Sequence, residues 1–228
     1  MGDLALDIIL YLTLGFLDGI AIVALGFKVF RFPISWYKRE IGLIAFILTC
    51  CSYIIRILVG FPELDMIIQY GLIVLFFRYL LKVKLFDSLM IPAVGYLIFD
   101  LVQLVIYPQM ISLGMISLED IQQNIGYGTY LVQVSGQVVC LLICWVLYQF
   151  NLGFSFITCP PHDVDVRFSL RGHDFLMFLG VVCSSLVFSG ILYWLFHYHN
   201  QWEFVTMAIV VILVLMLVIA YRKEGEDI

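Results

Sequence analysis

The stretch LALDIILYLTLGFLDGIAIVALGFKVF, residues 4–30, and the stretch RFPISWYKRE that follows it, residues 31–40, decide the fold. The first is apolar over nearly its whole length. At ~1.5 Å per residue, a helix made from it crosses the ~30 Å of hydrocarbon in a bilayer. The second stretch carries Arg31, Lys38 and Arg39, which hydrocarbon does not accommodate. The sequence therefore predicts a membrane span followed by a basic loop.

The composition of the whole chain agrees with this local pattern. Of its 228 residues, 63% are hydrophobic and only 13% are charged, with a mean hydropathy of +1.06. Soluble domains are about one quarter charged, so the composition excludes a single water-soluble domain. The formal charge of −5 and the pI of 5.2 give no indication of nucleic-acid binding. The lipid bilayer is the expected surrounding of most side chains.

The predicted fold class is all-α: a polytopic transmembrane helix bundle of seven spans that forms a single domain over residues 1–228. Four prolines or proline pairs fall between predicted spans, and Pro92 is expected to kink or begin the fourth. The predicted spans cover residues 4–30, 41–61, 66–81, 89–107, 127–150, 175–198 and 204–221. The prolines between spans are Pro33, Pro62, Pro108 and the pair Pro160–Pro161.

Basic residues alternate along the predicted loops. They occupy every odd-numbered loop and the tail, whereas the even-numbered loops hold acidic residues and no Lys or Arg. The basic set is Lys28, Arg31, Lys38, Arg39, Lys82, Lys84, Arg167, Arg171, Arg222 and Lys223; the acidic set is Glu63, Asp65, Glu119, Asp120 and Glu203. Lys and Arg are retained in the cytoplasm. The pattern predicts a multi-pass protein of the cell membrane with its N-terminus outside and its C-terminus in the cytoplasm.

Five ionisable residues fall inside the predicted spans, where a charge is costly and usually faces protein or water. Helical rise places Asp7, Arg56 and Asp100 in one layer, roughly 5–10 Å below the outer face. Asp18 and Arg78 share a deeper layer, ~20 Å down. Matching depths predicts an intramembrane charge pair between Asp18 and Arg78, and a pairing of Arg56 with Asp7 or Asp100.

Two interpretations of these charges compete. In the first, the pairs fix the register and rotation of the helices and have no other role. In the second, Asp7, Arg56 and Asp100 line a cavity open to the outside and bind a small or peptidic ligand. Uncharged polar residues of the outer half would complete that cavity: Gln69, Gln103, Gln133 and Gln137. A proton or ion path is a third alternative.

Signatures of enzymes and cofactor sites were sought and not found. The sequence has no G-x-S-x-G elbow, H-E-x-x-H helix or P-loop. The connection at residues 151–174 contains Cys159, His162 and His173, but their spacing matches no zinc pattern. We therefore expect a protein that is not an enzyme, with no catalytic residues, no metal and no cofactor.

Two stretches resemble a known family. FRYLLKVKLFDSLMIPAVGYLIFDLVQLVIYP, residues 77–108, combines a basic turn, a Ser-Leu pair and a long apolar span, and GTYLVQVSGQVVCLLICWVLYQF, residues 128–150, forms a later span. Both resemble the membrane sensor domain of bacterial peptide-sensing histidine kinases of the accessory-gene-regulator type, which carry a GHKL ATPase. The kinase part of that family has no counterpart in this sequence. The resemblance implies recognition of an extracellular or lipid-phase signal and transmission by helix movement.

These observations lead to a functional expectation. The chain is expected to be a non-enzymatic membrane sensor, signalling or accessory protein that binds a ligand in its outer half and contacts a cytoplasmic or membrane protein partner. One alternative is a small transporter or channel component that uses Asp18, Arg78 and Asp100. Another is an assembly or immunity protein that occupies the lipid-facing surface of a partner.

Overall fold

The computed structural model describes residues 2–117, 126–155, 157 and 202–226, and every regular element in them is a helix. The all-α class is therefore confirmed for this part of the chain. The predicted span at residues 175–198 and most of the connection before it lie outside the described residues. The helices are α1 (Gly2–Val29), η1 (Ile34–Trp36), α2 (Lys38–Tyr53), η2 (Ile54–Val59), α3 (Pro62–Tyr79), α4 (Leu85–Ser112), α6 (Tyr127–Gln149) and α8 (Trp202–Glu226).

Four of these helical segments are long and apolar enough to cross a membrane. They are Leu6–Val29, Lys38–Val59, Asp87–Ser112 and Tyr127–Gln149. They correspond to the first, second, fourth and fifth predicted spans. The third predicted span forms α3, which contains Asp65 and Arg78 and is not among the four. The last predicted span lies within α8.

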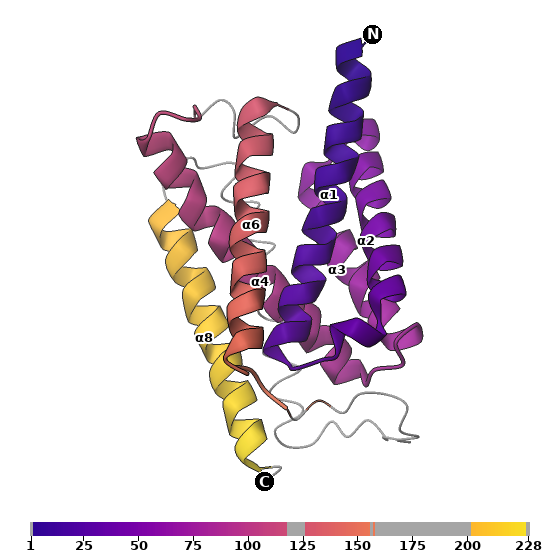
Figure 1. Cartoon of the computed structure of the whole chain (residues 1–228), viewed down its shortest axis with the longest axis vertical. Coiled ribbons are helices and arrows are strands. Elements are labelled where there is room, and N and C mark those ends of the chain that lie inside the picture. The colour runs from indigo at the N-terminus through magenta and orange to yellow at the C-terminus, as the bar shows by residue number, and fades with distance from the viewer. Residues whose placement is uncertain (1, 118–125, 156, 158–201, 227–228) are drawn as a thin grey trace.

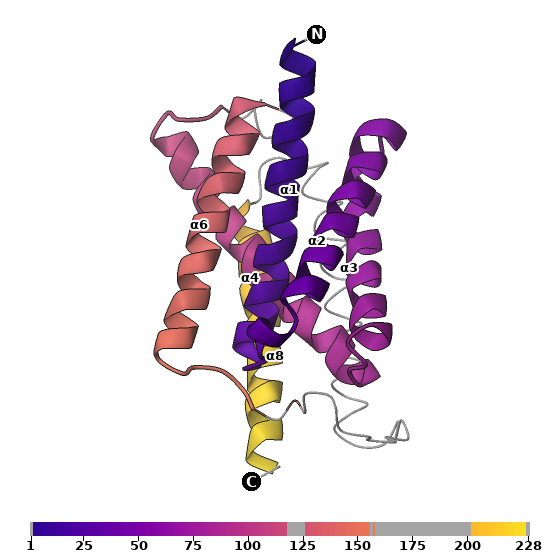
Figure 2. The same ribbon diagram turned by 45° about the vertical axis from the view of Figure 1, so that its right-hand side comes forward.

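α1 stands at the centre of the bundle. It packs against α2, α4 and α6, while α3 packs on α2 and α4, and α8 packs on α4 (Figures 1 and 2). Buried residues along α1, such as Leu25, Phe27 and Val29, join side chains of α2, α3 and α4 in one apolar core. The first residues of α1 and the last residues of α8 lie at opposite ends of the bundle.

Glycines bring α1 and α4 into close contact. A Cβ atom on Gly95 would lie 2.4 Å from the carbonyl oxygen of Ile22, and a Cβ atom on Gly26 would lie 2.5 Å from that of Ile91. Real Cβ atoms do not approach backbone this closely, so only glycine fits at either position. Small residues at helix crossings are the usual means by which membrane helices pack, because lipid provides no hydrophobic drive between them.

Two helices begin or end outside the predicted spans. α3 begins at Pro62, four residues before the predicted start, because proline has a fixed φ and needs no N–H donor at the first helical position. α4 extends beyond the predicted 89–107 at both ends and contains Pro92 and also Pro108, which was placed between spans. Prolines are tolerated in membrane helices where neighbouring groups satisfy the freed backbone.

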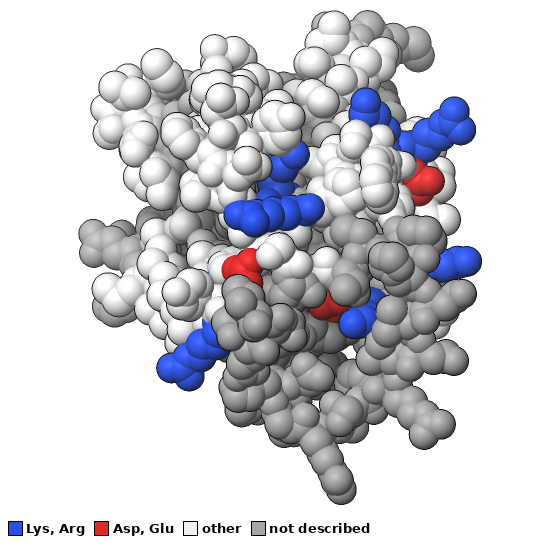
Figure 3. Space-filling model, turned by 60° about the horizontal axis from the view of Figure 1, so that its bottom comes forward, with Lys and Arg blue, Asp and Glu red and all other residues white. Residues whose placement is uncertain are grey.

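Lys and Arg gather at the end of the bundle where α1 and α8 finish (Figure 3). Lys28 lies in the last turn of α1 and Arg31 follows that helix, Lys38 begins α2, and Lys82 and Lys84 lie between α3 and α4. Residues that are far apart in the sequence therefore form one basic end. The opposite end contains the turn from η2 to α3.

Candidate functional site

Arg56 lies on a widened helical turn. The last part of the second span is the π-helix η2, which ends at Gly60 in a left-handed conformation with φ of +79°. The backbone N–H groups of Gly60 and Phe61 both donate to the carbonyl oxygen of Ile55, at 3.0 and 3.1 Å. π-Helical turns are rare and occur frequently at functional sites. This turn directs Arg56 toward α3.

Asp65 is the partner of Arg56. Its side chain has no exposed surface, and Nε of Arg56 donates to Oδ2 in an ion pair. Ser52 donates from Oγ to the same oxygen at 2.9 Å, and Gln69 donates from Nε2 to Oδ1 at 2.8 Å. Three donors from α2, η2 and α3 thus satisfy this carboxylate, as a buried charge requires.

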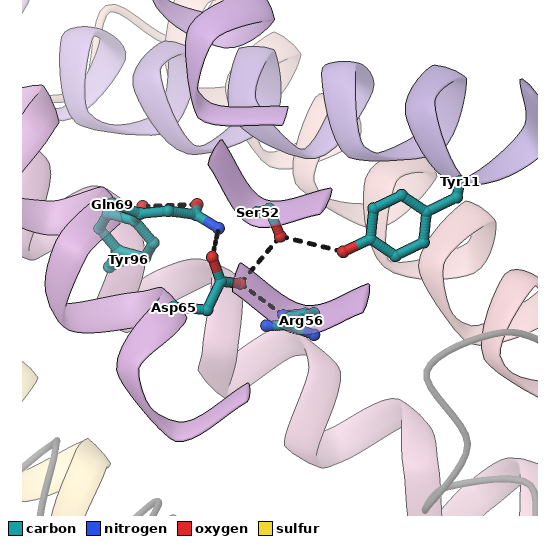
Figure 4. A network of polar contacts seen from close by, with 6 residues as sticks. All are labelled: Tyr11, Ser52, Arg56, Asp65, Gln69 and Tyr96. Carbon is teal, nitrogen blue, oxygen red and sulfur yellow. Dashed lines mark hydrogen bonds and ion pairs between the residues drawn. The ribbon is translucent and has the colours of Figure 1, made fainter. Parts of the chain in front are cut away.

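The hydrogen bonds continue on both sides of Asp65. Because Ser52 donates to Asp65, its oxygen is left to accept from the hydroxyl of Tyr11, 3.0 Å away. On the other side, Tyr96 donates from its hydroxyl to Oε1 of Gln69 at 3.1 Å. We call these six residues the polar network: Tyr11, Ser52, Arg56, Asp65, Gln69 and Tyr96 (Figure 4). It joins α1, α2, η2, α3 and α4.

The guanidinium group of Arg56 has hydrogen-bond donors beyond the one that binds Asp65. Its Nε is bonded to Asp65, but neither terminal amino group has an acceptor among the residues that the structure describes. The side chain is 38% exposed, whereas that of Asp65 is fully buried. The planar guanidinium group can therefore bind a further carboxylate, phosphate or carbonyl oxygen without breaking the pair with Asp65.

The predicted pairing of Arg56 with Asp7 or Asp100 was wrong. Asp65 had been assigned to an outside loop, but the earlier start of α3 adds a helical turn that places it beside Arg56. Asp7 instead lies next to Tyr130 of α6, whose hydroxyl is 3.3 Å from its backbone oxygen and 3.4 Å from Oδ1. Oδ2 of Asp100 is buried and has no hydrogen-bond partner among the described residues.

The predicted charge pair between Asp18 and Arg78 is replaced by other contacts. Oδ1 of Asp18 accepts a hydrogen bond of 2.9 Å from Nε2 of Gln137, which also donates to the carbonyl oxygen of Leu14 at 2.9 Å. Arg78 is exposed and donates to the carbonyl oxygen of Val83 at 3.2 Å. Equal depth did not bring the two together, because α1 packs mainly on α2, α4 and α6.

The remaining predicted residues lie at the contact of α4 with α6. Gln103 packs on Gly136, where an added Cβ atom would lie 3.1 Å from its Nε2. Gln133 has a buried Oε1 with no partner in the described part of the chain. Of the predicted ligand-binding residues, Arg56 and Gln69 belong to the polar network. Asp100, Gln103 and Gln133 line a neighbouring interface, and Asp7 lies near the N-terminal end of α1.

Sequence reasoning missed Tyr11, Ser52 and Asp65. One signal was available: Asp65 and Gln69 are four residues apart and share a helix face if the helix begins at Pro62. Within the residues described, no group of three His, Cys, Asp or Glu side chains is placed to hold a metal ion. Comparison with protein-family models, with curated proteins and with solved structures finds no match to this chain.

Proposed function

We propose that the chain is a multi-pass protein of the cell membrane with seven spans, its N-terminus outside and its C-terminus in the cytoplasm. Four helices of sufficient length and apolar character support this topology, and so do chain ends that lie at opposite ends of the bundle. The basic end of the bundle supports the orientation, because Lys and Arg are retained on the cytoplasmic side.

Reporter insertion tests this topology. A reporter enzyme that is active only outside the cell is inserted in turn at residues 31–37, 80–84 and 113–117, the connections after α1, α3 and α4. We expect activity at 113–117 alone. Activity at either basic connection would reject the orientation.

Within this bundle we propose a non-enzymatic sensor, signalling or accessory function, with a small or peptidic ligand bound in the outer half. The observation that carries the proposal concerns Arg56: its terminal amino groups have no acceptor among the described residues, while its Nε is bonded to a buried carboxylate. An acidic or carbonyl-bearing group of the ligand would occupy them. The other proposed ligand-binding residues are Asp7, Gln69, Asp100, Gln103 and Gln133.

Signal transmission follows from the position of Arg56 in the polar network. A ligand bound to Arg56 changes the balance of hydrogen bonds that reach α1 through Ser52 and α4 through Gln69. A ligand that prefers one packing of these helices shifts the population toward it. The resemblance to peptide-sensing membrane domains supports the same reading. A protein partner would detect the shift at the basic end.

The test compares two alanine variants of the candidate span Lys38–Val59 in a deletion strain of the host. Arg56→Ala removes the proposed ligand contact, and Lys38→Ala removes an exposed positive charge at the other end of the same span. We expect wild type and Lys38→Ala to restore the transcript profile of the undeleted strain. Arg56→Ala should fail to restore it at an equal amount in the membrane fraction. Restoration by Arg56→Ala would reject the site.

A second candidate, a small transporter or channel component, is favoured by one specific observation. In the middle of a candidate span, Asp100 has a buried oxygen that receives no hydrogen bond from the described residues, and intramembrane carboxylates of this kind mark substrate or ion pathways. Uptake or current in liposomes that contain the purified chain would favour this candidate. An Asp100→Asn variant would then lose the flux, whereas in the sensor reading neither protein shows any.

A further inference from the structure

Arg56 lies close to one end of a candidate span. The span Lys38–Val59 ends three residues after it. At ~1.5 Å per residue, the backbone of Arg56 is therefore ~5 Å inside that end. Long basic side chains near the end of a membrane helix extend along it, so that the charged group reaches the interface where lipid phosphates lie. The terminal amino groups of Arg56 are thus within reach of lipid headgroups.

The exposed surface next to Arg56 is apolar. Four large apolar side chains are exposed in the described structure between η2 and the first turn of α3. We call them the apolar rim: Leu58, Val59, Phe61 and Leu64. A ligand that is polar throughout would leave this surface uncovered, whereas hydrocarbon chains would cover it favourably. The surroundings of Arg56 therefore suit a ligand with one acidic group and an apolar remainder.

The guanidinium group can bind a second oxyanion while it stays paired with Asp65. Arginine has five N–H donors, and Asp65 takes the one on Nε. The oxygens of Asp65 already accept from Ser52 and Gln69 as well, so this carboxylate is satisfied without the terminal amino groups. Two terminal amino groups in one plane match two oxygens of a phosphate. Residues 40–77 contain no other Lys or Arg, so Arg56 is the cation available there.

We propose that the ligand of Arg56 is a membrane phospholipid. Its phosphate group binds the terminal amino groups of Arg56, and its acyl chains lie along the apolar rim. The inference rests on the proposed function, because it names the chemical class of the ligand that Arg56 binds. It combines the two properties of this surface, a guanidinium with unused donors and adjacent apolar side chains.

Native mass spectrometry of the delipidated full chain in a neutral detergent tests the proposal. The protein is titrated with phosphatidylglycerol, with diacylglycerol that has the same acyl chains, and with glycerol phosphate. We expect saturable binding of phosphatidylglycerol that approaches one molecule per chain. Diacylglycerol lacks the phosphate and glycerol phosphate lacks the chains, so each should bind at least ~tenfold more weakly.

Three results of this titration would overturn the proposal. Equal binding of diacylglycerol would show that the phosphate is not recognised. Equal binding of glycerol phosphate would show that the ligand is a soluble phosphate rather than a lipid. Absence of saturable binding for all three compounds would show that neither is bound. The wild-type titration decides these outcomes without any variant.

Two variants assign the binding to Arg56. The double variant Arg56→Met with Asp65→Leu removes the guanidinium without leaving an unpaired buried carboxylate. It should bind phosphatidylglycerol at least ~tenfold more weakly than the wild type. Lys38→Ala is the matched control, since it removes a positive charge from the other end of the same candidate span, and it should bind as the wild type does. Unchanged binding by the double variant would overturn the assignment to Arg56.

Failure of this inference is distinguishable from failure of the proposed function. If phosphatidylglycerol does not bind and Arg56→Ala still fails to restore the transcript profile, the ligand class is wrong and the sensor function stands. If phosphatidylglycerol binds through Arg56 and Arg56→Ala restores the profile, the lipid site stands and the sensor function is rejected.

Discussion

Asp65 connects more of the polar network than any other residue in it. Ser52, Arg56 and Gln69 all donate to its two oxygens, and its side chain has no exposed surface. Removing one partner from a buried ion pair leaves the other charge uncompensated, which usually costs more than the pair contributes as a whole. Replacing either Arg56 or Asp65 alone should therefore lower the free energy of unfolding strongly, whereas replacing both together should lower it only slightly.

Substituting Asp65→Ala should lower the free energy of unfolding by about 3 kcal/mol, at the low end of the range for buried pairs because Arg56 is partly exposed. The double variant Asp65→Leu with Arg56→Met should recover most of this loss, since it leaves no unpaired charge. Unfolding in mixed micelles with increasing sodium dodecyl sulfate measures both values.

The Asp7→Ala variant serves as the control for this prediction, because Asp7 is bonded to a single tyrosine rather than to a charge. A double variant that is as unstable as Asp65→Ala would show that shape rather than charge at this position stabilises the bundle.

At the scale of the element, the contact of α1 with α4 depends on glycine. Gly95 and Gly26 each place bare backbone against a carbonyl oxygen of the opposite helix. One glycine is on each helix, so the two backbones approach each other at two places along the crossing. The crossing fixes how α1 and α4 are rotated, and this rotation places Tyr11 and Tyr96 in the same network.

Gly95→Ala should therefore destabilise the protein by about 1–3 kcal/mol, since the new methyl group forces the helices apart. Gly71→Ala is the matched control: it is also a helical glycine, on α3, and an added Cβ atom there meets nothing within 4 Å. It should be neutral or stabilise by up to ~1 kcal/mol through helix propensity. Equal effects of the two changes in the same unfolding assay would contradict the close contact.

At the scale of the whole molecule, the segment after α6 forms hydrogen bonds that connect α6 with α1 and α8 at the basic end. The N–H of Phe154 donates to the carbonyl oxygen of Val29 at 2.8 Å, which connects the segment to α1. Ser155 donates from its N–H at 3.0 Å and from its hydroxyl at 2.8 Å to Oε1 of Glu224 on α8. Gly153 adopts φ of +130°, and a Cβ atom there would lie 2.6 Å from the oxygen of Val29.

The hydroxyl and then the N–H of Ser155 stabilise the charged form of Glu224 and lower the pKa of its carboxyl below the ordinary value. A lowered pKa in the folded state means that this contact stabilises the fold at neutral pH and is lost as the pH falls through the folded pKa. An NMR titration of ¹³C-labelled glutamate, with Glu224→Gln to assign the signal, measures the midpoint. Ser155→Ala should raise that midpoint, and an unchanged midpoint would show that the contact is absent in solution.

The positions of several helices and of the basic connections were predictable, because both follow from the order of apolar and charged residues along the chain. Residues 4–30 and 127–150 were correctly predicted as helices, and the basic connections before α2 and α4 were correctly placed at one end with the end of α1. The site was less predictable. Arg56 and Gln69 were recognised as polar residues of one region. Asp65 was assigned to a loop, because a charged residue close to the end of an apolar stretch is usually placed outside the span, whereas α3 begins at Pro62.

The sequence alone indicated that the chain forms long apolar helices and that its basic residues fall in alternate connections. Only the tertiary structure decided which polar groups meet. Depth along a helix placed Asp18 level with Arg78, yet Asp18 bonds to Gln137, and Arg56 bonds to Asp65. Depth follows from counting residues, whereas a contact also requires the rotation of each helix about its axis, and that rotation is set by packing between helices.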